Sequence, residues 1–263
     1  IMTDKYPYQT SDANLAEASK SPDVELAVTG IKSLPAMAGL DWIKDAFNLF
    51  KMNPLIWIVL VVLWFILNIV MQFVPILGGL AMTLLYAVFV AGFLVGCAAL
   101  ERGESLEVGH LFAGFKSNTG SLIGLGACYL AAIILWAIIV GVLAFSGAGG
   151  LAIFTDPESI NPAAFLSSGA LMAVLISLLL MIPIMMMFWF APALISLGGI
   201  PLIESLKMSF SGCLKNILPM FIFGLIMSVL AVLASLPFFL GWLVLMPIGM
   251  AAFYTAYKSI YTD

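Results

Sequence analysis

The sequence predicts an all-α polytopic membrane protein. Its six transmembrane helices are expected to form three parallel repeats, each an interfacial amphipathic helix followed by a helical hairpin. Of the 263 residues, 63% are hydrophobic and only 9% are charged. An average soluble domain carries about 25% charged residues, so a water-soluble fold could not cover this much apolar surface. The composition therefore excludes an ordinary globular enzyme, a nucleic-acid-binding protein and a disordered chain, and it favours a chain that crosses a bilayer several times.

Four long stretches without a charged residue define the spans. The first and the last are each long enough for two helices of about 20 residues, and Pro and Gly residues interrupt them at 74–79 and 236–241. The two middle stretches hold one helix each and share a loop at 146–167, which is rich in turn-forming residues. The predicted helices cover 54–73, 76–100, 120–145, 168–196, 217–236 and 239–259.

The basic residues predict the orientation. With six spans both termini lie on one side of the membrane, and all ten lysines and arginines fall on that side. The only charged residues in the loops on the opposite side are Asp156 and Glu158. Because basic loops stay in the cytoplasm, we expect both termini to be cytoplasmic.

The expected domain organisation is a flexible polar cytoplasmic tail at 1–36 and a transmembrane domain at 37–263. The tail contains no apolar core of the kind that a signal peptide needs. Within the transmembrane domain, the predicted repeats cover about 40–100, 104–196 and 202–260.

A short amphipathic segment precedes the first, third and fifth spans. The first two segments share the pattern Phe-x-x-Phe-Lys-x-Asn, which ends at Asn53 and at Asn118. The third segment keeps Leu214-Lys215-Asn216, one residue shorter. Recurrence of this kind indicates a repeated structural unit.

The amphipathic pattern predicts where these segments lie. In the first segment the large apolar side chains share one helical face and the charged ones take the other. Such a helix lies in the headgroup plane with its aromatic face against the acyl chains, and Lys-x-Asn marks the turn into the bilayer. A lipid-headgroup site or a docking ridge for a protein partner is the alternative. The candidate contact residues are Trp42, Phe47, Phe50, Lys51, Asn53, Phe112, Phe115, Lys116, Asn118, Phe210, Lys215 and Asn216.

No charged residue lies within a predicted span, which argues against a proton relay, an ion-coupled antiporter or a voltage sensor. Asn68 and Gln72 lie one helical turn apart and are expected to hydrogen bond between helices or to line a polar cavity. A single histidine, His110, excludes a multi-histidine metal or haem site. We therefore expect no catalytic residue, no cofactor and no metal.

Several of these stretches together resemble a known family. They are Trp42 to Pro54, Ala99 to Phe115, Trp189 to Leu194, and Ser209 to Asn216. Over about residues 40–260 the chain resembles an uncharacterised family of proteobacterial integral inner-membrane proteins with six spans. The resemblance implies a bacterial inner-membrane location and brings no catalytic or binding residue. A vaguer likeness is to the membrane domain of some glycerophosphodiester phosphodiesterases, which is not their catalytic part.

Three functions are consistent with these features. The first is a non-enzymatic accessory subunit, assembly factor or scaffold, which acts through membrane phospholipids and a protein partner or a second copy, and not through nucleic acid. The alternative is a binder or carrier of lipid or another apolar molecule, which requires a cavity between the three hairpins. A core filled by Phe, Leu and Met side chains would count against this alternative. A membrane enzyme is the third, and it would need a cluster of polar side chains at one depth.

Overall fold

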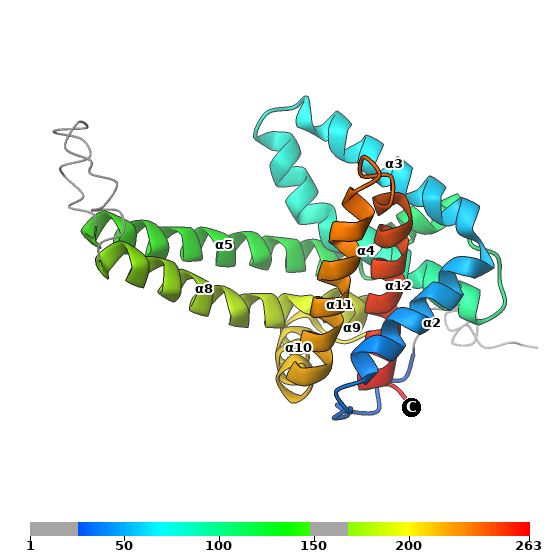
Figure 1. Ribbon diagram of the computed structural model, residues 1–263. Coiled ribbons are helices and arrows are strands. Elements are labelled where there is room, and N and C mark those ends of the chain that lie inside the picture. Colours follow the sequence, from blue (N-terminus) through cyan, green and yellow to red (C-terminus); the bar gives the residue numbers. More distant parts are fainter. Residues whose placement is uncertain (1–25, 148–167) are drawn as a thin grey trace, which may run out of the picture.

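The computed structural model describes residues 26–147 and 168–263, which are helical with connecting loops and contain no strand (Figure 1). Six spans long and apolar enough to cross a membrane confirm the predicted fold class and the number of spans. The helices that form them are α3 (Pro54–Gln72), α4 (Leu77–Glu101), α5 (Thr119–Gly147), α8 (Ser168–Trp189) with α9 (Ala191–Ser196), α11 (Ile217–Ser235) and α12 (Trp242–Tyr261).

The turns of the first and last hairpins each contain a left-handed residue shortly before a glycine. Ile76 and Phe239 both adopt a φ of 64°, in the left-handed region, and each lies two residues before a glycine. A Cβ atom on Gly78 would overlap the Met71 carbonyl, and one on Gly241 would overlap the Ala234 backbone. Glycine therefore lets the second helix of each hairpin approach the end of the first. This turn also explains why α12 begins later than the predicted residue 239.

Each hairpin follows a short helical element, as the amphipathic segments predict. These elements are α2 (Ala38–Met52), the 3₁₀ helix η1 (Val108–Phe115) and α10 (Leu202–Lys215). In the second element the Glu107 N–H donates to His110 Nδ1 at 2.9 Å, which caps the start of η1. The single histidine of the chain, His110, therefore has a local structural role as a helix cap.

The short elements pack against the second helices of other hairpins. α2 lies along α12, η1 lies on α4, and α10 lies on α8. The element before one hairpin thus contacts the second helix of the preceding hairpin, and α2 closes the series on the last helix of the chain. In Figure 1 α2 crosses beside α12 at the same end of the molecule as α10.

The buried face of α2 corrects the prediction of a lipid-facing aromatic stripe for that element, whereas Phe112 and Phe115 of η1 are exposed. In α2 the buried side chains include Trp42 and Phe50, at 3% and 8% exposure. The Trp42 Nε1–H donates to Ser259 Oγ of α12 at 2.7 Å. In α10 the buried side chains are small, Ser209 and Cys213 among them, whereas Leu214 is exposed. The apolar face of α2 therefore packs against protein, because α12 covers it.

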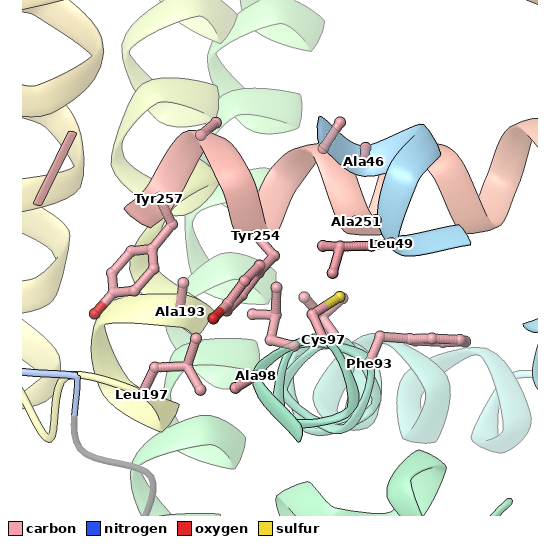
Figure 2. Packing of buried hydrophobic residues seen from close by; sticks show 14 of the residues in the cluster. Ala46, Leu49, Phe93, Cys97, Ala98, Ala193, Leu197, Ala251, Tyr254 and Tyr257 are labelled. Atoms are coloured by element: carbon pink, nitrogen blue, oxygen red, sulfur yellow. The ribbon is translucent and has the colours of Figure 1, made fainter. Parts of the chain in front are cut away.

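The largest cluster of buried side chains joins the short elements to the spans. Figure 2 shows Tyr254 and Tyr257 of α12 beside Ala193 of α9, with Phe93 and Cys97 of α4 on the same side. These side chains are almost fully buried. This end of the molecule, here called the base, is densely packed.

A serine hydroxyl interrupts the helix that runs from α8 into α9. Ser209 Oγ of α10 donates to the Met186 carbonyl at 2.7 Å and accepts from the Phe190 N–H at 2.9 Å. These two backbone groups stand four residues apart, so they would bond each other in a continuous helix. Insertion of a side chain into this ladder bends a helix, and here it separates α8 from α9.

Residues 26–36 of the predicted tail lie against the base. The Leu26 N–H donates to the Leu197 carbonyl at 2.8 Å, and the Lys32 N–H donates to the Ile260 carbonyl at 2.8 Å. The prediction of a flexible tail over 1–36 is therefore wrong for residues 26–36, which are hydrogen bonded to the base. Residues 1–25 and 148–167, with the loop carboxylates Asp156 and Glu158, lie outside the described residues.

Candidate functional site

A cavity of about 880 Å³ lies between the three hairpins. Ligand pockets typically enclose about 300–1,000 Å³, so its volume suits a small molecule or part of a lipid. All six spans contribute to its wall, with Trp64 from α3, Tyr86 from α4, Tyr129 from α5, Phe188 from α8, and further residues from α11 and α12. The tertiary arrangement of all three hairpins therefore forms this space, and no single hairpin does.

Within residues 26–147 and 168–263, no charged side chain contributes to the wall of this cavity. Aromatic rings and methionines dominate it, and methionine side chains adapt readily to ligands of varied shape. The aromatic members are Trp64, Tyr86, Tyr129, Phe188, Trp189, Phe223, Trp242 and Phe253, and the methionines are Met82, Met185, Met227, Met246 and Met250. Such a wall favours an uncharged apolar occupant over an ion.

The polar side chains of the wall leave part of their hydrogen-bonding capacity free. Asn68, Thr83 and Ser228 each donate to a carbonyl four residues earlier on their own helix, at 2.7–2.9 Å. Tyr86 and Tyr129 also line the cavity, and neither hydroxyl forms a hydrogen bond to another described residue. The cavity thus offers a few neutral groups that could hydrogen bond to an occupant.

The wall residues recur at matching positions of the three hairpins. Trp64, Tyr129 and Met227 each stand eleven residues after the asparagine that precedes their hairpin. The five wall residues of α4 and the corresponding five of α12 also have the same spacing. They are Met82, Thr83, Tyr86, Ala87 and Val90 in α4, and Leu245, Met246, Gly249, Met250 and Phe253 in α12.

The aromatic residues predicted for the interface occupy different environments. Trp42 and Phe50 are buried in the protein, as described above. Phe47 is 45% exposed, and Lys51 Nζ lies 5.0 Å from the centre of its ring. Phe112 and Phe115 are exposed and pack their edges against Phe89. Phe210 is half-buried.

The asparagines that end the three short segments, here called the elbow asparagines, have different structural roles. Asn216 is fully buried and hydrogen bonds to Leu34, Lys32 and Gly212, all at 2.9 Å. Asn118 has a positive φ and donates to the Ile195 carbonyl at 3.0 Å.

Asn53 connects α2 to α3 without a side-chain cap. Of the elbow lysines, Lys116 is exposed and Lys215 donates to the Ile31 carbonyl at 3.4 Å.

The predicted intramembrane pair does not act as a unit. Asn68 lines the cavity and donates to the Trp64 carbonyl at 2.8 Å, whereas Gln72 is exposed at the end of α3. No hydrogen bond joins the two side chains. Of the two roles that the sequence left open, Asn68 has the cavity-lining one.

Sequence reasoning did not identify most of the cavity wall. Tyr86, Tyr129 and Trp189 come from different spans, and no sequence spacing brings them together. A usable signal was the distance of eleven residues from the asparagine that precedes each hairpin, which Trp64, Tyr129 and Met227 share.

The chain is similar to a probable inner membrane protein of Burkholderia thailandensis. The two are 29% identical over 246 residues, which is 86% of this chain and 89% of the relative. No protein-family model matches the chain, and no solved structure matches it. The similarity and the six apolar spans together identify the chain as a multi-pass inner membrane protein that resembles other bacterial inner-membrane proteins, as the sequence predicted.

Proposed function

We propose that the protein binds an uncharged apolar molecule from the bilayer in the cavity between its hairpins. The observation that carries this proposal is the cavity itself, an uncharged space of about 880 Å³ where a solid core would have excluded a ligand. The sequence favoured an accessory or scaffold role first. The cavity favours the alternative of an apolar-molecule binder or carrier, and we adopt it.

The proposed activity is binding without chemical conversion. General acid–base catalysis needs a titratable group held close to the reacting atoms. Among the described residues, the wall offers only neutral amide, hydroxyl and indole groups, without a carboxylate, a lysine or a histidine. The same chemistry suits the chain or ring system of a lipid with at most a neutral polar group.

We further propose that the chain consists of three copies of one unit, arranged around the cavity. Contacts support this, because each short element packs on the second helix of the preceding hairpin. Burial supports it too, because four buried positions of α2 have buried counterparts in α10 that lie 163 residues further along the chain. The residues are Trp42, Ala46, Leu49 and Phe50 of α2, and Ser205, Ser209, Gly212 and Cys213 of α10. The same separation relates Asn53 to Asn216 and the two hairpin glycines to each other.

Filling the cavity should reduce ligand binding. Gly249 lines the cavity, and a Cβ atom there would meet only the flexible end of Met227 at 3.5 Å. Gly249→Leu should therefore place apolar atoms in the cavity and lower lipid occupancy by roughly ten-fold, a cost of about 1.4 kcal/mol. The measurement is photo-crosslinking of the purified protein in nanodiscs that contain a phospholipid with a diazirine in its acyl chain, with the labelled peptides located by mass spectrometry.

The matched control is Gly141→Leu. Gly141 lies on α5 outside the cavity wall, and a Cβ atom there would meet nothing within 4 Å. Both variants make the same substitution in a helix, so a loss of labelling in Gly249→Leu alone supports the cavity. Equal labelling of wild type and both variants would exclude it as the binding site.

We also propose that both termini face the cytoplasm, because all ten basic residues lie on the side of the termini. Phe238, at the tip of the last hairpin, is 92% exposed, and Lys116 is exposed at the other end of the spans. With Cys128→Ala as background, Phe238→Cys should react with a membrane-impermeant maleimide added to intact spheroplasts, and Lys116→Cys should react only after lysis. The reverse pattern would mean that the termini lie outside.

A further inference from the structure

The base of the cavity is closed. Phe253 lines the cavity and stacks on Phe190, which is fully buried, with 5.5 Å between the ring centres. Below this pair lies the densely packed base with Tyr254, Tyr257 and Tyr261. A molecule from the aqueous side would have to displace this core to reach the cavity.

Two of the three seams between hairpins are also closed. At the seam between the first and second hairpins, α4 packs along α5, and a Cβ atom on Gly126 would overlap the Leu84 backbone. At the seam between the last and the first, α12 packs against both α3 and α4. Helices in such close contact leave no passage for a chain.

The third seam, between α8 and α11, is different. α8 packs on α5 and, near the base, on α10, but it does not pack along α11 within the described residues. Figure 1 shows the hairpin of α5 and α8 extending away from α11. The break between α8 and α9, where Ser209 of α10 hydrogen bonds to Met186 and Phe190, gives a local reason for this divergence.

The side chains that border this seam belong to the cavity wall, and several of them are exposed. Met185 of α8 is 48% exposed and Ser228 of α11 is exposed, and both line the cavity. Gly224, one turn from Ser228, has nothing within 4 Å of its Cβ position. Wall residues on both sides of this seam therefore face open space.

We propose that the seam between α8 and α11 is a lateral portal through which an acyl chain of a bilayer phospholipid enters the cavity. This rests on the proposed binding function and specifies its ligand and its route. The headgroup stays outside, because the uncharged wall offers no partner for a phosphate. The apolar spans immerse the portal in the bilayer, so the acyl chain remains in an apolar environment throughout.

The test joins the two sides of the portal. In a Cys128→Ala background, Met185→Cys and Ser228→Cys place one thiol on each side, while Cys97 and Cys213 remain buried. Bismaleimides of graded length join the two thiols, and a monofunctional maleimide on the same variant is the matched control. Protein loaded with the diazirine phospholipid in nanodiscs is mixed with an excess of unlabelled phosphatidylcholine vesicles, and loss of crosslinked cavity peptides is followed over time.

The joined protein should exchange its lipid at least ten-fold more slowly than the monofunctional control, with the crosslinks still in the cavity wall. Exchange at the control rate in the joined protein, with Gly249→Leu still lowering occupancy, would overturn the portal and leave the binding function standing. Crosslinks absent from the cavity wall in every variant would overturn both. The two proposals thus fail on different measurements.

Discussion

Asn216→Ala should lower the midpoint of thermal unfolding more than a substitution at either other elbow asparagine. The Asn216 carboxamide is fully buried, and it accepts from the Leu34 N–H and donates to the Lys32 and Gly212 carbonyls. Alanine removes all three hydrogen bonds and leaves these backbone groups without their side-chain partner. At about 1 kcal/mol for each net bond, the expected loss is about 3 kcal/mol, which corresponds to a shift of roughly 6–12 °C for a chain of this size.

The loss of stability should begin at residues 26–36, because two of the three hydrogen bonds hold this segment. Amide hydrogen exchange of Leu34 should accelerate in Asn216→Ala before the spans open. Asn53→Ala is the matched control, since Asn53 occupies the same place before α3 and provides no side-chain cap. If Asn216→Ala unfolds at the temperature of Asn53→Ala, the buried carboxamide does not anchor this segment.

Gly114→Ala is expected to disrupt the packing of η1 on α4. A Cβ atom at Gly114 would overlap the carbonyl oxygen of Val88, and a backbone atom cannot move aside as a side-chain end can. Since overpacking of a close contact costs about 1–3 kcal/mol, unfolding in mild detergent should begin several degrees lower. Differential scanning fluorimetry of the purified variant measures this shift.

Gly109→Ala is the control within the same element. Gly109 lies in η1, and its Cβ position has nothing within 4 Å. The same substitution should therefore leave the unfolding temperature within about 1–2 °C of wild type, since exposed substitutions change stability by about 0.5 kcal/mol or less. Equal destabilisation by both variants would mean that alanine lowers stability through the helix geometry of η1 and not through contact with Val88.

The spans could be predicted because the bilayer imposes a local rule. A run of about 20 apolar residues without a charge is sufficient to cross it, and the four uncharged stretches meet this rule residue by residue. The breaks at 74–79 and 236–241 were equally readable, because glycine and proline act on their immediate neighbours. The turns of the first and last hairpins lie where they were predicted, whereas most of the loop predicted at 146–167 is outside the described residues.

The orientation of the short elements could not be read in the same way. Hydrophobic periodicity distinguishes an apolar face from a polar one, but acyl chains and protein interiors satisfy the apolar face alike. Trp42 and Phe50 face α12 and its neighbours, which lie some 200 residues further along the chain. In α10 the packed face consists of small residues such as Ser209 and Gly212, which a search for large apolar side chains overlooks.

The sequence by itself determined that this protein crosses the membrane six times, where the first and last hairpins turn, and where each short element precedes a hairpin. These features depend on contiguous residues and on the solvent around them. Only the tertiary structure decided that α2, η1 and α10 bury a face on other hairpins, that Tyr86 and Tyr129 line one cavity, and that α8 does not pack along α11 within the described residues. Those features depend on the relative placement of distant helices, which the packing of the base sets and which no local pattern encodes.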